Sequence, residues 1–262
     1  MRLRSVIAAL VLLAQTSGAF AGEADCPLTV AEQVTVTAVI DGGSFELADG
    51  RRVRLEGIQS PMLSLGRSNV PDWPLAAEAK QNLSKLVLNQ TVGLAFDERG
   101  TDRHGDVVAH VFADGTHEWL QSRLVSDGFA RVNTKPDARQ CAAALLAKEG
   151  EARAAKRGIW AHPFYRVRQT ADLDGTIGTF QIVEGKVLSA VERRDRIFLN
   201  FGIDYRSDFT VTISPRDAKR MAKNGTDPLA WSAKRVRVRG WISLLNGPEM
   251  ELTHPEQLEV LK

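Results

Sequence analysis

The chain has 262 residues, enough for one large or two small domains, and its 34 basic and 32 acidic residues give a formal net charge of +2. A protein that binds nucleic acid mainly by neutralising phosphates is usually far more basic. Composition alone therefore does not indicate a nucleic-acid partner.

The first residues have the pattern of an export signal. Arg2 and Arg4 give a positive start, residues 6–14 are apolar, and residues 19–21 form a small-residue cleavage site. The apolar stretch is shorter than the roughly 20 residues that span a bilayer. We expect residues 1–21 to be a cleaved signal peptide and the mature chain to be periplasmic or secreted, without a membrane span; an uncleaved anchor is the alternative. Cleavage would leave 34 − 2 = 32 basic residues facing 32 acidic ones.

Residues 28–162 show the elements of a first domain. Alternating apolar residues predict strands, and apolar residues three or four apart predict helices. The expected strands are 34–40, 44–47, 52–58, 91–96 and 107–112, and the expected helices are 76–88, 119–126 and a long one from Pro136 to Gly158. Five strands with helices inserted among them are typical of an OB-like barrel.

Residues 163–178 are polar and contain glycines, which predicts a linker before a second domain at 179–262. Strands are expected at 180–191, 196–201, 209–213, 235–242, 249–253 and 258–261, with a helix at 215–223. This order predicts a second, small OB-fold barrel. The expected fold class is thus mainly β with α (α+β), built from two OB-like barrels.

Four motifs stand in one order and spacing across the first domain. They are Val39-Ile40-Asp41-Gly42-Gly43-Ser44-Phe45, Arg52-Val53-Arg54-Leu55-Glu56-Gly57-Ile58-Gln59-Ser60-Pro61-Met62, Thr101-Asp102-Arg103-His104-Gly105-Asp106 and Ala152-Arg153-Ala154-Ala155-Lys156-Arg157-Gly158-Ile159-Trp160. Together they resemble the thermonuclease (staphylococcal nuclease) family over roughly half the chain. The resemblance implies an OB-like barrel and, in an active member, calcium-dependent hydrolysis of phosphodiester bonds.

The catalytic positions implied by the resemblance are mostly not matched. A hard cation needs oxygen ligands, but the two aspartate ligands correspond to Gly43 and Gln59. The general base corresponds to Met62, which accepts no proton. The second of two charge-stabilising arginines corresponds to Asp106, so only Arg54 matches. These differences predict a non-catalytic domain.

Several positions of this domain leave alternatives open. Asp41 either stabilises its turn or lies near a metal, and Arg54 either binds phosphate or pairs with Glu56 or Asp106. A replacement site built from Asp41, Glu56 and Asp106 is a further alternative. The base-stacking tyrosine that the resemblance implies is not recognisable in residues 133–136.

In the second domain, Arg235, Arg237 and Arg239 alternate along one strand, and Trp241 follows them. Alternation places the arginines on one face of the strand. A basic groove beside an aromatic side chain suits single-stranded nucleic acid, because bases stack on aromatic rings and cations follow the phosphates. The alternative is a solvated barrel face.

Cys26 and Cys141 are the two cysteines of the chain. An even number in an exported protein predicts a Cys26–Cys141 disulfide. No second Cys or His stands at ligand spacing from either one, so we expect no metal site there.

The sequence therefore favours an exported, thermonuclease-like protein that is not catalytic and has no cofactor. Its expected partner is single-stranded nucleic acid or an envelope protein. The alternatives are a divalent-metal nuclease with an altered site, which would need Ca²⁺, and a structural envelope protein.

Overall fold

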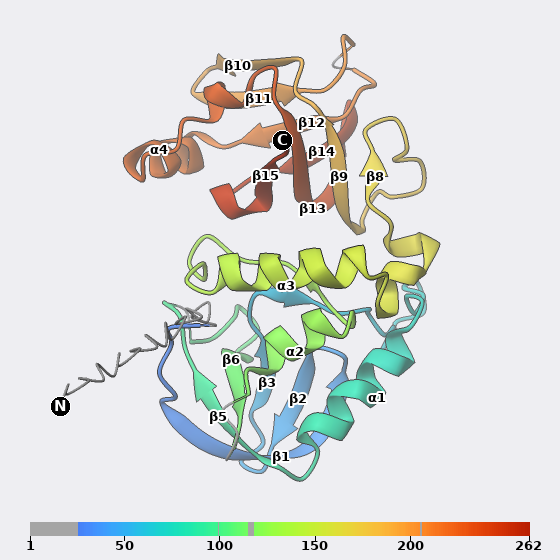
Figure 1. The fold of residues 1–262 in the computed structure, drawn as a ribbon, viewed down its shortest axis with the longest axis vertical. Coiled ribbons are helices and arrows are strands. Elements are labelled where there is room, and N and C mark those ends of the chain that lie inside the picture. The colour runs from blue at the N-terminus through green and yellow to red at the C-terminus, as the bar shows by residue number, and fades with distance from the viewer. Residues whose placement is uncertain (1–25, 99, 115–117, 205) are drawn as a thin grey trace, which may run out of the picture.

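The computed structural model describes residues 26–262 except 99, 115–117 and 205, so the predicted signal peptide lies outside the described residues. The chain forms two halves, with helix α3 (Ala142–Ala154) at the boundary between them (Figure 1). No helix among the described residues is long and apolar enough to cross a membrane.

The first half is the predicted five-stranded barrel. It is closed in the order β1 (Glu32–Asp41), β2 (Ser44–Leu47), β3 (Arg52–Leu55), β6 (Val107–Ala113) and β5 (Thr91–Ala95). Strands β3 and β6 run parallel, and the other neighbours are antiparallel. Alternation along the strands turns apolar side chains inward, as Val53 and Leu55 do on β3.

Three helices cover this barrel, namely α1 (Ala76–Val87), α2 (Leu120–Ser126) and α3. The first two agree with the expected ranges to within a residue. The long helix predicted from Pro136 is wrong at its start, because residues 135–141 form turns and α3 begins at Ala142, after Cys141. Two short strands, β4 (Ile58–Gln59) and β7 (Arg131–Val132), pair beside the barrel, and the 3₁₀ helices η1 (Gly158–Ala161) and η2 (Pro163–Tyr165) follow α3.

The predicted second barrel is not confirmed, because pairing among the described residues gives a sheet. Its order is β10 (Ser189–Arg193), β11 (Arg196–Asn200), β12 (Thr210–Ile213), β14 (Gly247–Glu251), β13 (Arg235–Leu245), β9 (Phe180–Lys186) and β8 (Arg168–Gln169). Strand β15 (Leu258–Val260) also pairs with β13. Helix α4 (Pro215–Lys223) follows β12, and two 3₁₀ helices, η3 (Pro228–Trp231) and η4 (Pro255–Gln257), complete this half.

The two halves nevertheless have one arrangement of neighbouring strands in common. The parallel pair β12–β14 lies between antiparallel neighbours, as β3–β6 does in the first half. The predicted strand 180–191 is split at Val187, whose N–H donates to Lys234 O of the segment before β13, while Leu188 N–H donates to Asn200 O of β11. The split occurs where the chain changes pairing partner.

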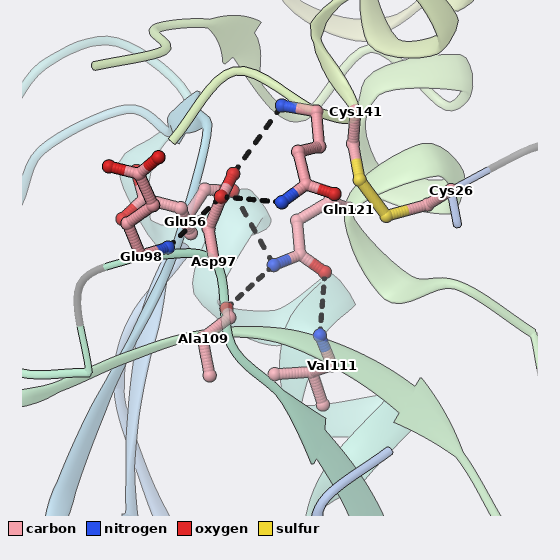
Figure 2. The surroundings of a disulfide bond; sticks show 9 residues. Cys26, Glu56, Asp97, Glu98, Ala109, Val111, Gln121 and Cys141 are labelled. Carbon is pink, nitrogen blue, oxygen red and sulfur yellow. Dashed lines mark hydrogen bonds between the residues drawn. A yellow bond between two sulfur atoms is a disulfide. The ribbon is translucent and has the colours of Figure 1, made fainter. Parts of the chain in front are cut away.

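The predicted disulfide between Cys26 and Cys141 is confirmed, with the two Cα atoms 5.0 Å apart. It joins the start of the described chain to the residue before α3, across 115 positions of sequence. Figure 2 shows Gln121 of α2 nearby, where its buried amide accepts from Val111 N–H and donates to Ala109 O of β6. The bridge therefore lies beside a fully hydrogen-bonded contact between helix and barrel.

A hydrophobic cluster joins the two halves, and we call it the shared cluster. Its buried members are Trp73, Ala152, Ile159, Trp160, Tyr165, Phe180 and Ile182, which come from both halves. The guanidinium of Arg131 lies 4.9–5.6 Å from the ring centroids of Trp73, Tyr165 and Phe180, and it donates to Phe180 O at 2.8 Å. Second-half residues are thus part of a core that begins in the first half.

Candidate nucleic-acid cleft

A cleft of about 450 Å³ lies where the predicted catalytic positions converge. The β1–β2 turn, strand β3, the segment after β4, the loop at 101–106 and Trp241 of β13 border it. Its polar lining side chains are Asp41, Ser44, Arg52, Arg54, Gln59, Ser60, Arg67, His104 and Asp106. Residues of the thermonuclease-like motifs are thus brought together at one place.

The β1–β2 turn is stabilised by Asp41. Its Oδ1 accepts hydrogen bonds from Gly43 N–H and from Ser44 Oγ, both at 2.8 Å. These contacts match the turn-stabilising alternative for Asp41. A Cβ atom added at Gly43 would meet Ser60 Oγ at 3.5 Å, an ordinary contact distance, so the turn has room for a side chain there.

The Gln59 amide nitrogen and the Ser60 hydroxyl both hydrogen-bond within the protein. The Gln59 amide Nε2 donates to the Ser60 carbonyl at 2.9 Å, and Ser60 Oγ donates to Gly42 O at 2.7 Å. The Ser60 carbonyl is therefore already an acceptor, and Gln59 presents a neutral amide where a carboxylate ligand would stand.

Met62 is half-buried and packs against the shared cluster. Its carbonyl accepts from Trp73 N–H at 2.8 Å, which holds this segment beside the cluster. The position expected to hold a general base thus forms part of the apolar contact with the second half.

Three arginines give the cleft its cationic wall. Arg52 and Arg54 are two residues apart on β3, so they share its outer face. Arg54 is 56% exposed and lies 3.4 Å from Asp102 Oδ2. Arg67 donates to Ser64 O and Leu63 O, and neither it nor Arg52 has an ion pair among the described residues.

The cleft carries a small positive charge. Its three arginines face two aspartates, Asp41 and Asp106, which gives 3 − 2 = +1 with His104 neutral. Asp102 stands beside the cleft and offsets part of this charge, since its Oδ2 lies 3.4 Å from Arg54 while its Oδ1 accepts from His104 N–H and Asp106 N–H. Anions are the ligands that such a wall favours.

Comparison with known proteins agrees with this geometry. The family model described as Staphylococcal nuclease homologue matches residues 52–162. A thermonuclease from Staphylococcus intermedius is 29% identical over 132 residues, which are 49% of this chain and 76% of that protein. A thermonuclease from Staphylococcus hyicus is 26% identical over 130 residues, 48% and 75% of the two chains. This chain contains a thermonuclease-like domain.

The residues of this thermonuclease-like domain do not fit the calcium ion that the resemblance implies. Gly43 has no ligand atom in its side chain, and the amide of Gln59 is turned to the Ser60 carbonyl. A calcium site needs several oxygen ligands, commonly with carboxylates among them. The residues at these positions therefore supply too few ligands for a calcium ion.

The alternative carboxylate site is not assembled either. Asp41 and Asp106 border the cleft, whereas Glu56 is buried and lines a neighbouring pocket. Burial raises the pKa of Glu56 although its Oε1 accepts from Gly57 N–H. Among the described residues, the only group of three metal-ligating side chains is Cys26, His110 and Cys141, whose two sulfurs form the disulfide.

The structure does not show the open groove that was predicted beside the three arginines of β13. They do share one face, but α3 of the thermonuclease-like domain covers part of it. Arg239 is 1% exposed and pairs with Glu149 and Glu259, and Arg237 pairs with Glu184 and Glu259. Only Arg235 remains largely exposed, 3.6 Å from Glu184. The three cannot together line an open groove, because Arg239 is buried between the halves and Arg237 is held by carboxylates of β9 and β15.

Sequence reasoning did not assign Arg52 and Arg67 to the cleft, and it placed Trp241 in a different groove. Arg52 could have been found, because it stands two positions before Arg54 on the same strand. Arg67 lies in a loop without a motif, and Trp241 comes from the other half of the chain. Their approach to the cleft depends on contacts between distant segments.

Proposed function

We propose that this protein is an exported, non-catalytic thermonuclease-like protein that binds nucleic acid in the cleft of its first domain. Arg52, Arg54 and Arg67 hold phosphate groups there, and binding requires no calcium. The protein leaves the bound strand intact. Export is supported by the Cys26–Cys141 bridge, since disulfides persist mainly in oxidising compartments.

One observation carries the proposal, namely that the cleft combines arginines with inert residues at the catalytic positions. Arginine recognises phosphate through a planar fork of donors, and this function needs no metal and no base. Hydrolysis needs both. Gly43, Gln59 and Met62 offer neither a carboxylate ligand nor a proton acceptor. The site is therefore suited to retaining a strand rather than cutting it.

The small charge of the cleft sets the expected strength of binding. With a net charge of only +1 from the lining residues, electrostatic attraction is modest and screened by salt. Binding should be strongest at low ionic strength and should weaken as counterions compete for the phosphates.

The test is a titration of a fluorescently labelled single-stranded DNA with the full chain, in chelator, at several salt concentrations. We expect anisotropy to report binding, and Arg54→Ala to reduce the slope of log K against log salt by about 0.7, the value for one phosphate contact on a single strand. Arg216→Ala is the matched control, because its side chain is 83% exposed on α4 and outside the cleft. Absence of binding at low salt, or equal slopes for both variants, would refute the proposal.

A further inference from the structure

Trp241 connects the second half of the chain to the cleft. It lies on β13 and borders both the cleft and a neighbouring pocket of about 200 Å³, and Arg54 lines both of these hollows. The other residues of that pocket include Asn133 and Lys135 of the thermonuclease-like domain. A large aromatic side chain is thus placed next to a cation that faces the cleft.

The ring of Trp241 is held in position and still exposed. Its centroid is 6.1 Å from that of Trp73, at an interplanar angle of 47°, and 6.2 Å from that of Phe180, at 75°. Neither neighbour stacks parallel on the ring, and 40% of Trp241 remains exposed. The neighbouring rings already fix the orientation of this tryptophan, while part of its surface stays exposed. It therefore loses little conformational freedom when it binds a flat ligand.

The strand that carries Trp241 is fixed to the first domain. Arg239, two residues earlier on the same face of β13, pairs with Glu149 of α3 at 2.8 Å. The main chain of Trp241 pairs with Phe180 of β9, a member of the shared cluster. The second half therefore supplies an aromatic wall that the thermonuclease-like domain does not build from its own residues.

We propose that the cleft binds single-stranded nucleic acid, with an unpaired base stacked on Trp241 while Arg54 and Arg52 hold the adjacent phosphates. The inference rests on the proposed function and specifies its ligand. Base–aromatic stacking tolerates any sequence because every base has a π-face. In a duplex the faces of the bases are already stacked on one another, so a single strand is the form that offers a base to Trp241.

The test compares the full chain with Trp241→Ala and Trp241→Phe on a labelled single-stranded DNA at low salt. Stacking on an aromatic side chain is worth a factor of roughly 5 to 150 in affinity, so Trp241→Ala should raise Kd by that factor and Trp241→Phe by less. The salt slope should be the same for Trp241→Ala as for the unchanged protein, because no phosphate contact is lost. Leu244→Ala is the control, since Leu244 is an exposed apolar residue of the same strand that does not line the cleft.

A second measurement does not depend on the folding of any variant. The unchanged protein should bind a strand with abasic sites less tightly than the intact strand, and a duplex less tightly than either strand alone. Absence of all binding would overturn both the proposed function and this inference. Binding that neither Trp241→Ala nor base removal weakens, or equal affinity for the duplex, would overturn this inference alone.

Discussion

Arg239 of β13 and Glu149 of α3 form an ion pair of 2.8 Å that is almost completely buried, with side chains 1% and 0% exposed. Glu149 also accepts Val132 N–H through Oε1 at 2.7 Å, and Glu259 pairs with the other terminal nitrogen of Arg239. The pair joins the thermonuclease-like domain to the second half and fixes the strand that carries Trp241. Both terminal nitrogens of Arg239 have a carboxylate partner, whereas its buried Nε has no hydrogen-bond partner among the described residues, so the contact depends on both carboxylates.

Removing one member of this pair should destabilise the protein strongly. Arg239→Met leaves the buried Glu149 with Arg153, at 3.2 Å, as its remaining ion-pair partner. Losses of about 3–5 kcal/mol in the free energy of unfolding are typical when one member of a buried pair is removed. Chemical denaturation measures the loss. Arg235→Ala is the control, because Arg235 is largely exposed and should change stability by less than about 0.5 kcal/mol. A loss below about 1 kcal/mol for Arg239→Met would contradict the buried pairing.

Met62 should tolerate apolar but not charged substitution. Its side chain packs against the shared cluster, so Met62→Glu places a carboxylate in an apolar contact and should cost about 1–3 kcal/mol. Met62→Leu keeps the volume and should cost less than about 1.5 kcal/mol. Thermal unfolding of the two variants gives the comparison, and equal stability of both would contradict the packing of position 62 against the shared cluster.

Much of the first half follows from its sequence pattern, because the strands alternate and the turns are short. Strand β2 of the first half has the predicted bounds, and so does helix α4 of the second half. The start of α3 differs from the prediction. Proline is a common first residue of a helix, so a helix was expected from Pro136, but turns occupy the segment up to Cys141 and α3 begins after them. On β13 alternation predicts the arginine face correctly. The alternation along β13 contains no information on α3, which lies far away in sequence and covers Arg239.

In the cleft, too, the sequence predicts what depends on local motifs and does not predict what depends on contacts between distant segments. Gly43, Gln59, Met62 and Asp106 could be placed by motif spacing, and the structure gathers all four around one cleft. Trp241 was expected beside a basic groove of its own domain. The structure places it against the other domain, because β13 docks on α3 and the shared cluster. Such docking has no periodic signal in a single sequence.

Loss of the disulfide should weaken the fold without removing it. The bridge closes a loop of 115 residues, for which chain-entropy arguments give about 4–5 kcal/mol, an upper range for what is usually measured. The double variant Cys26→Ser with Cys141→Ser should lower the midpoint of chemical denaturation, and reductant should shift the unchanged protein but not the variant. Labelling of two free thiols in the unreduced native protein would contradict the bridge.

Acid should destabilise the protein through two buried histidines. Burial lowers the pKa of His110 to about 4, and burial with the nearby Arg139, Lys135 and Arg220 cations lowers the pKa of His254 to about 3. Both are neutral above their unfolded pKa of 6.5, where they cost nothing. Below pH 6.5 these two histidines bind protons in the unfolded chain but stay neutral in the folded chain until the pH reaches their lowered pKa values. The free energy of unfolding therefore falls as the pH falls.

The contribution of His254 can be separated by substitution. Its Nε2 lies 2.8 Å from Thr134 Oγ1 across the boundary between the halves, and His254→Gln keeps a polar partner without a titrating group. We expect the stability of this variant to decline less steeply than that of the unchanged protein, by up to about 1.4 kcal/mol per pH unit below 6.5. The raised pKa of Glu56 acts in the opposite direction in both proteins and cancels in the comparison. Parallel pH curves would contradict the burial of a neutral His254.

The most direct test of the central claim measures binding and cleavage in one sample. The full chain is incubated at low salt with a single-stranded DNA labelled at one end, either in calcium or in chelator. Anisotropy reports binding, and a denaturing gel of the same sample reports strand length. We expect binding in both conditions, since it requires no calcium, and a strand that stays at full length. Shortened strands in calcium that are absent with chelator, or no anisotropy change in either condition, would contradict it.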